Sequence, residues 1–322
     1  MADGTGMKTE DICDRFITGK TLKAEPFGDG HINDTYRIYA TEGIYVLQRL
    51  QPKMRTDSLE HNYEVYSDLL DHAGILYPKW VKDFDGKYFY TDDNGNSWRM
   101  YPFIDGSLLS APLKRERLFA LGQGIAGLHV AFGSMDGKPE AVYPMLHDLK
   151  YYYDRYVSIL KRDDVRPDRR DDHLEAVIES SIGRFVDKGL EEKRIVHGDP
   201  KLANILFKDE KVIAFLDMDT VMMGSLSEDI ADCIRSCCVS DKKTDRDAAR
   251  IIVDGYVSAA PKDMAEEIKD RLPYAFEKIC FELALRYYTD FISSYGIFKE
   301  KYPGYGLKRA EELIGLSRLL IN

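Results

Sequence analysis

The pattern of hydrophobic and polar residues differs between the first third of the chain and the remainder. In the first third, short runs rich in β-branched and aromatic residues are separated by turn residues such as Glu42-Gly43 and Asp92-Asp93-Asn94-Gly95. Such runs are typical of antiparallel strands joined by tight turns. Between them, apolar residues recur at helical spacing over residues 57–73. The predicted strands are residues 21–27, 35–40, 44–49, 87–91 and 97–103.

Beyond residue 106 the pattern is mainly helical, interrupted by short β segments at 194–196 and 212–216. The predicted helices are residues 113–132, 147–162, 171–188 and the stretch from Asp229 to the end, with breaks near Pro261, Pro273 and Tyr302-Pro303-Gly304. A sheet-rich region followed by a helix-rich one predicts an α+β fold with two lobes. The segment 103–106 is the expected hinge between them.

Composition restricts the possible partners. The 322 residues include 45 Lys plus Arg and 55 Asp plus Glu, a formal net charge of −10. Nucleic acids and anionic membranes attract cationic surfaces, so we expect neither as a partner. Five cysteines without zinc-type spacing indicate a reducing compartment. With no signal peptide and no apolar run of the ~20 residues that a membrane span needs, we expect a soluble, cytoplasmic protein.

The strongest chemical pattern lies on the loop after the β segment 194–196. Asp199 stands two residues after His197, and Asn204 follows five residues after Asp199. Protein kinases place an Asp and an Asn in the same way: the Asp accepts the proton of the attacking hydroxyl, and the Asn holds a metal ion. At this spacing the two side chains converge on one phosphoryl group from the two ends of a single loop. Asp199 is therefore the candidate catalytic base.

A second acidic residue, Asp217, ends the apolar segment that follows. A carboxylate at the end of a buried strand is costly unless it pairs or binds a metal. The predicted hairpin 206–216 turns at Asp209-Glu210-Lys211 and returns Asp217 to the side of Asn204. An Asn and an Asp that leave room for nucleotide phosphates suit Mg²⁺ better than zinc. Both residues are therefore candidate metal ligands.

The N-terminal sheet supplies candidate nucleotide contacts. Gly28-Asp29-Gly30-His31 lies between two predicted strands, where backbone N–H groups of a glycine-rich loop can face phosphates. Kinases carry a lysine on the third strand, but here that strand offers Gln48 or Arg49, and the pattern does not decide between them. Glu64 on the following helix is either the ionic partner of that residue or a solvated position.

The last predicted strand, residues 97–103, supplies further candidate nucleotide contacts. ATP is expected to lie between the two lobes, with its adenine ring against the backbone around Met100, Tyr101 and Phe103. Residues 1–103 are thus the predicted nucleotide-binding lobe. Residues 104–322 are the predicted helical lobe for catalysis and substrate binding.

Together these motifs identify the chain as similar to the aminoglycoside phosphotransferase and choline kinase superfamily, which has a protein-kinase-like two-lobed fold. Within it, the chain most resembles the N-acetylhexosamine 1-kinases, which phosphorylate the anomeric hydroxyl of N-acetylglucosamine or N-acetylgalactosamine. That family also has Gln-Arg on the third strand. The resemblance is carried by residues 26–36, 45–49, 197–206, 216–235 and 286–307.

The resemblance implies a small-molecule kinase that uses ATP and Mg²⁺ to phosphorylate a sugar hydroxyl. It makes Asp199 the base and Asn204 and Asp217 the Mg²⁺ ligands. Arg286 and Asp290, at positions i and i+4, would share one helix face, where they either bind the sugar or form a surface ion pair. The residues implied for the sugar pocket are His31, Asp199, Asp219, Arg286 and Asp290.

Two other interpretations remain open. The same chemistry could serve another acceptor, such as an aminoglycoside, choline or homoserine. An aminoglycoside would require a carboxylate-rich pocket, whereas Arg286 among Glu277, Glu282 and Asp290 favours a neutral, hydroxyl-rich ligand. The missing third-strand lysine favours a non-catalytic, nucleotide-sensing pseudokinase, which the complete set of base, Asn and metal-binding Asp opposes. Neither Asp-Phe-Gly nor Ala-Pro-Glu occurs, which disfavours a protein kinase.

Overall fold

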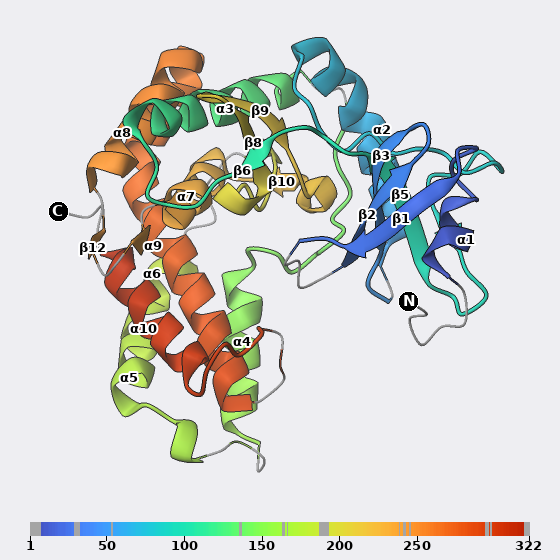
Figure 1. Ribbon diagram of the computed structural model, residues 1–322. Coiled ribbons are helices and arrows are strands. Elements are labelled where there is room, and N and C mark those ends of the chain that lie inside the picture. Colours follow the sequence, from blue (N-terminus) through green and yellow to red (C-terminus); the bar gives the residue numbers. More distant parts are fainter. Residues whose placement is uncertain are drawn as a thin grey trace.

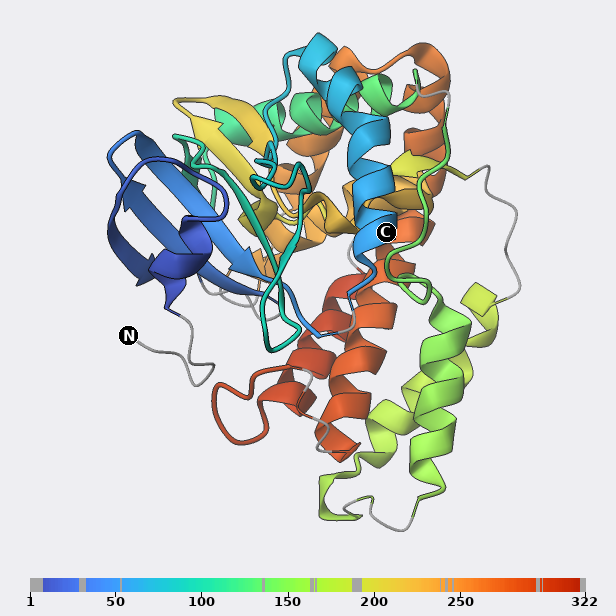
Figure 2. The same cartoon turned by 90° about the vertical axis from the view of Figure 1, so that its right-hand side faces the viewer.

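The computed structural model confirms a mixed α+β fold in which an antiparallel sheet precedes a mostly helical remainder (Figure 1). The sheet lies on one side of the molecule, and most of the helices occupy the other side and extend below it (Figure 2). The structure describes residues 8–28, 33–52, 54–134, 137–162, 165, 167–186, 193–237, 239–240, 243–244, 246–293, 296 and 298–318.

The predicted N-terminal sheet is confirmed, with five antiparallel strands in the order β1-β2-β3-β5-β4. These strands are β1 (Thr21–Pro26), β2 (Asp34–Ala40), β3 (Gly43–Arg49), β4 (Tyr90–Thr91) and β5 (Ser97–Pro102). A short helix that the sequence pattern did not predict, α1 (Thr9–Cys13), covers one face of the sheet. Because side chains alternate between the faces of a strand, Leu47 and Met100 pack beneath α1, whereas Gln48 and Arg99 project from the opposite face.

The predicted helix after the sheet is confirmed as α2 (Thr56–Ala73). It ends at Gly74, whose left-handed backbone (φ 69°) closes the helix in the usual way. The apolar face of α2 joins the large core of the helical region. Its buried members are Leu59, Tyr63, Tyr66 and Leu70.

The remainder of the described chain contains eight further helices. They are α3 (Arg115–Phe132), α4 (Leu149–Leu160), α5 (Asp172–Ser181), α6 (Gly183–Val186), α7 (Leu226–Cys237), α8 (Arg246–Ala259), α9 (Lys262–Ser293) and α10 (Tyr305–Ser317). Helices α4, α9 and α10 run side by side in the lower part of the molecule (Figure 2). Helices α3 and α8 approach so closely that a Cβ atom on Gly122 would lie 1.9 Å from the Ile252 carbonyl oxygen.

Two expectations about these helices were wrong. No break occurs near Pro273, which lies inside the continuous helix α9. Proline removes one backbone hydrogen bond, but buried residues on both sides, including Leu272 and Ala275, hold the helix in the core. The single helix expected over 171–188 is divided into α5 and α6 around Ile182.

Short strands and 3₁₀ turns in the helical region position the candidate site. Strand β7 pairs with β10, and β8 lies between β6 and β9 in a three-stranded sheet. The predicted hairpin is therefore confirmed. The short elements are β6 (Ser107–Leu108), β7 (Arg194–Val196), β8 (Ile205–Lys208), β9 (Lys211–Phe215), β10 (Met222–Gly224), β11 (Val239–Ser240), β12 (Lys243–Thr244) and the 3₁₀ turns Pro167–Arg169, Leu202–Asn204 and Met218–Thr220.

In the part of the chain that the structure describes, no helix combines the length and apolar character of a membrane span. Four cysteines are buried free thiols, namely Cys13, Cys233, Cys237 and Cys280. The fifth cysteine, Cys238, lies outside the described residues.

Candidate active site

One buried carboxylate anchors the loop that carries Asp199. Asp229 of α7 accepts hydrogen bonds from the backbone N–H groups of His197 (3.1 Å) and Gly198 (2.8 Å). It also accepts one from Nε2 of His129 (3.0 Å), and its side chain is only 1 % exposed. Burial alone would raise the pKa of Asp229, but contacts with His129 and the Gly198 N–H lower it instead. The loop of Asp199, the candidate catalytic loop, is thus held by a charged acceptor.

Gly198 is required by the close packing of this loop. Its backbone is left-handed (φ 84°), and an added Cβ atom would lie 2.4 Å from the carbonyl oxygen of Thr220. A side chain at this position would therefore push the catalytic loop away from the segment that follows Asp217.

His197 joins the candidate catalytic loop to the segment that carries Asp217. Its Nε2 donates to the Leu216 carbonyl (2.9 Å), and its Nδ1 accepts from the Asp199 backbone N–H (3.3 Å). The Leu216 N–H in turn donates to the Asn204 carbonyl (2.8 Å). These bonds place Asp217 directly beside the loop, as the hairpin predicted.

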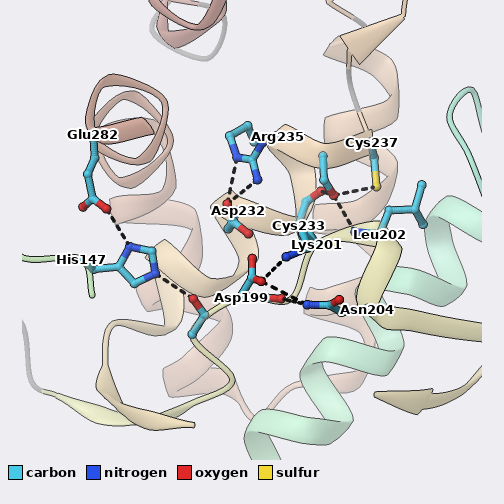
Figure 3. A network of polar contacts seen from close by, with 12 residues as sticks. His147, Asp199, Lys201, Leu202, Asn204, Asp232, Cys233, Arg235, Cys237 and Glu282 are labelled. Carbon is cyan, nitrogen blue, oxygen red and sulfur yellow. Dashed lines mark hydrogen bonds and ion pairs between the residues drawn. The ribbon is translucent and has the colours of Figure 1, made fainter. Parts of the chain in front are cut away.

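The side chains of Asp199, Lys201 and Asn204 converge (Figure 3). The Asp199 carboxylate forms an ion pair with the Lys201 ammonium and accepts from Nδ2 of Asn204 (3.2 Å). Nδ2 of Asn204 also donates to the Asp199 carbonyl (2.8 Å), so its Oδ1 is the atom left for another ligand. Asp199 retains 26 % exposure, and a substrate can therefore reach it.

The donor atoms at this place fit a hard divalent cation. Burial, together with the carboxylates of Asp219 and Asp199, raises the pKa of Asp217 to about 6. Such a surplus of buried negative charge is what a divalent ion neutralises, and carboxylate and amide oxygens are ligands of Mg²⁺. Within the described residues, no three His, Cys, Asp or Glu side chains form a metal site alone. Nucleotide phosphates would therefore have to supply further oxygens.

The structure decides which third-strand residue faces this site. Gln48 is the cross-strand partner of Arg99, and Arg99 forms a buried ion pair with both oxygens of Asp219 (2.6 and 2.8 Å). Arg49 projects from the other face of β3, where it pairs with Asp34 (2.5 Å). Glu64 is exposed on α2.

Aromatic rings join two segments that are predicted to bind the nucleotide. Phe27, directly before Gly28, meets Phe103 edge to face with ring centroids 5.9 Å apart. The guanidinium of Arg37 lies over both rings, 3.9 Å from the centroid of Phe27 and 4.6 Å from that of Phe103. The start of the predicted phosphate loop and the residue that follows strand β5 are therefore neighbours, whereas Asp29, Gly30 and His31 lie outside the described residues.

The backbone of Met100 to Phe103, which was predicted to contact adenine, already forms hydrogen bonds within the N-terminal region. The Met100 carbonyl accepts from the Val81 N–H (2.8 Å), and the Phe103 N–H donates to the Ile44 carbonyl (2.9 Å). The Met100 side chain is buried in the core beneath α1, while Tyr101 is half-buried and burial raises the pKa of its hydroxyl. An adenine ring would therefore have to contact other backbone groups of this segment.

A histidine links the catalytic loop to helix α9 (Figure 3). Nε2 of His147 donates to the Gly198 carbonyl (2.8 Å), and Nδ1 lies 3.4 Å from Oε1 of Glu282. Burial alone would lower the pKa of His147, but the Glu282 carboxylate outweighs it and raises this pKa to about 10. The ring is therefore a half-buried cation that contacts the backbone directly before Asp199.

The two residues implied for the sugar pocket on α9 make separate contacts. Arg286 lies 3.7 Å from Glu282 and over the ring of Tyr152 (4.8 Å). The Asp290 carboxylate accepts from the Phe298 N–H (3.0 Å) and is 7 % exposed. Arg286, at 27 % exposure, is the more accessible of the two.

Sequence patterns did not single out several residues that build this site. Lys201 and Asp229 lie within the stretches that carry the resemblance, so their neighbours could have indicated them. Arg99 stands between Trp98 and Met100, and a charge within an apolar strand is a signal of a buried ion pair. His147 had no such signal, because its partners are distant in the chain.

An α+β fold that gathers two acidic side chains, a lysine and an asparagine on adjoining loops has the architecture of a kinase-like phosphotransferase. The chain belongs to the phosphotransferase enzyme family, whose sequence model matches residues 23–263. This confirms the resemblance at the level of the aminoglycoside phosphotransferase and choline kinase superfamily.

Individual relatives are distant. The chain is 22 % identical over 262 residues to a homoserine kinase of Methylobacterium radiotolerans, which covers 78 % of this chain and 76 % of the relative. Choline kinase from Cryptosporidium parvum Iowa II has 13 % identity and a TM-score of 0.65, covering 97 % of this chain and 95 % of that one. Amicoumacin kinase hAmiN in complex with AMP-PNP, Ca²⁺ and Ami has 12 % identity and a TM-score of 0.66, covering 95 % and 91 %. At these identities the solved structures establish the fold alone.

Proposed function

We propose that the protein is a Mg²⁺- and ATP-dependent kinase that phosphorylates a hydroxyl of a small molecule. The observation that carries this proposal is the bond between Asp199 and Asn204, on a loop that hydrogen bonds through His197 and Asn204 to Leu216, the residue before Asp217. Asn204 and Asp217 would hold Mg²⁺, which neutralises phosphate charge when bound. Asp199 would align the acceptor hydroxyl with the γ-phosphorus and take its proton.

Lys201 adds a cation to this proposal. Its ammonium is paired with Asp199, and this contact raises the pKa of Lys201 against the opposing effect of burial. The side chain is therefore charged at neutral pH and lies where the transferred phosphoryl group would pass. Because the transition state of phosphoryl transfer is loose, alignment and charge neutralisation matter more than strong proton abstraction.

For the acceptor we favour a sugar, first the anomeric 1-OH of an N-acetylhexosamine such as N-acetylglucosamine or N-acetylgalactosamine. Three carboxylates of α7 and α9 near this loop are already paired with cations. The pairs are Glu228 with Lys278, Asp232 with Arg235, and Glu282 with His147. A polycationic aminoglycoside needs unpaired carboxylates, so a neutral ligand rich in hydroxyl groups fits these surroundings better.

Homoserine is a second candidate acceptor. Two homoserine kinases, from Methylobacterium radiotolerans and Brucella anthropi, match at 22 % and 23 % identity. The half-exposed guanidinium of Arg286 would suit the carboxylate of an amino acid.

An acceptor panel tests the proposal. Purified protein is incubated with Mg-ATP and, separately, N-acetylglucosamine, N-acetylgalactosamine, other hexoses, homoserine, choline and kanamycin, and ³¹P NMR identifies each product. We expect an anomeric phosphate, whose phosphorus couples to H-1, from an N-acetylhexosamine. Asp199→Asn should lower this turnover by at least about 100-fold. If only homoserine yields a product, homoserine replaces the N-acetylhexosamine as the proposed acceptor. If no acceptor yields a product and the protein does not bind ATP, the proposed kinase activity is refuted.

A further inference from the structure

Strand β3 lacks the lysine that kinases place on their third strand. A buried arginine, Arg99 of the neighbouring strand β5, lies directly beside position 48 of β3. Thr35, Gln48 and Arg99 are direct cross-strand neighbours on β2, β3 and β5. Side chains in one such row project from the same face of a sheet. Arg99 therefore points in the direction that a lysine at position 48 would take.

Gln48 orients this arginine. Oε1 of Gln48 accepts from Nε of Arg99 (2.9 Å), and Nε2 of Gln48 donates to the Thr35 hydroxyl (3.2 Å). With Nε held in this way, the two terminal nitrogens of Arg99 donate to the two oxygens of Asp219 (2.6 and 2.8 Å). The Arg99 and Asp219 side chains are only 4 % and 3 % exposed. A two-pronged contact shielded from water is strong and strongly directional.

Helix α2 supports the arginine with aromatic rings. Cζ of Arg99 lies 5.1 Å from the ring centroid of Trp80, and Trp80 stacks on Tyr63 of α2 with centroids 4.3 Å apart. Kinases pair the third-strand lysine with a glutamate of the corresponding helix. Here Glu64 is exposed and is not placed to pair with Arg99. Helix α2 instead supports Arg99 through the stacking of Tyr63 on Trp80.

Asp219 connects this row to the metal-binding segment. It follows Asp217 by two residues, in the 3₁₀ turn Met218–Thr220, whereas Arg99 belongs to the N-terminal sheet. We propose that Arg99 is a positioning residue: through Asp219 it holds the loop of Asp217 against the nucleotide-binding sheet, in place of a third-strand lysine. This inference rests on the proposed Mg-ATP chemistry and assigns Asp219 to Arg99 rather than to the sugar.

Calorimetric titration of nucleotides tests this role without any acceptor. Four proteins are compared: the wild type, Arg99→Gln, the double variant Gln48→Lys/Arg99→Gln, and Arg250→Gln as a control at a position with 70 % side-chain exposure. Each is titrated with Mg-ATP and with ADP in EDTA, after circular dichroism has established that it is folded. The double variant returns the cation to the third strand.

We expect Arg99→Gln to weaken Mg-ATP binding by at least about tenfold, since the Asp217 loop is no longer held. Binding of ADP in EDTA should change by less than about twofold, because no metal is involved. The double variant should recover most of the loss, and Arg250→Gln should match the wild type. A purely structural role for Arg99 would lower both affinities together and allow no recovery.

Several results would overturn the inference. Equal Mg-ATP affinity of wild type and Arg99→Gln would do so, as would a folded double variant without recovery. Should Arg99→Gln not fold, the double variant and Arg99→Lys decide: affinity within about threefold of wild type supports the role of the cation, and a tenfold loss in both refutes it. A wild type that binds no Mg-ATP would instead overturn the proposed function, and this role with it.

Discussion

Replacing Asp229 by Asn tests how the fold positions the catalytic loop. Asn keeps the size of the side chain but replaces a charged oxygen by an NH₂ group, which cannot accept a hydrogen bond. Three groups donate to Asp229: the backbone N–H groups of His197 and Gly198, and Nε2 of His129. In the variant, at least one of them faces the NH₂ group, another donor, in a buried site. An unsatisfied buried donor costs about 1–3 kcal/mol.

The lost charge adds to this cost. Removing one partner from a buried, charged network typically destabilises a protein by about 3–5 kcal/mol, and we expect a loss in this range for Asp229→Asn. A typical domain is stable by only about 5–15 kcal/mol. The loop should also move, and a displacement of about 1 Å at reacting groups can lower a rate about 100-fold.

Urea unfolding and steady-state kinetics measure both effects. Asp254→Asn, on the exposed side of α8, is the matched control and should behave as the wild type. His129→Gln should lower stability with a smaller loss in kcat, because the two loop N–H groups keep their acceptor. A variant Asp229→Asn with an unchanged urea midpoint and unchanged kcat would refute the anchoring role, and reduced stability with full kcat would limit that role to stability.

Three further outcomes follow from single contacts. Lys201→Met should lower kcat by about 100-fold or more with a smaller change in KM for ATP, and an unchanged kcat in the acceptor assay would contradict this. The stability contributed by protonated His147 is complete below its unfolded pKa of about 6.5 and lost as pH rises through about 10. The urea midpoint of the wild type should therefore fall more between pH 7 and 10 than that of His147→Gln. If the two midpoints fall in parallel with pH, protonated His147 does not stabilise the fold. Gly122→Ala should cost at least about 2 kcal/mol in calorimetric unfolding, because its Cβ would meet the Ile252 carbonyl; an unchanged Tm would show that α3 and α8 can separate freely.

The elements that the sequence predicted well are those decided by local pattern. The five-stranded sheet and helix α2 are marked by alternation, helical spacing and turn residues, and each was confirmed. The hairpin that returns Asp217 to Asn204 is short, so its geometry follows from its length. Pro273 misled the prediction because its local preference for ending a helix is outweighed by packing along α9.

Contacts between distant segments could not be predicted. The choice between Gln48 and Arg49 depends on the register of β3 against β5, which residue patterns within β3 do not contain. The bond from Arg99 to Asp219 spans 120 positions, and the anchor at Asp229 joins residues that lie in separate predicted elements. Periodicity shows which face of an element is buried, but the partner on that face depends on how the whole chain packs.

The Mg²⁺ dependence of ATP binding tests the proposed site most directly. Calorimetric affinities for ATP are measured with Mg²⁺ and with EDTA, for the wild type and for Asp217→Asn. We expect Mg²⁺ to tighten binding by the wild type at least about tenfold and to have little effect on Asp217→Asn, which should still bind ATP in EDTA. A wild type that binds ATP equally well in both conditions, or an Asp217→Asn variant with the full response to Mg²⁺, would contradict the assignment of Asp217 as a metal ligand.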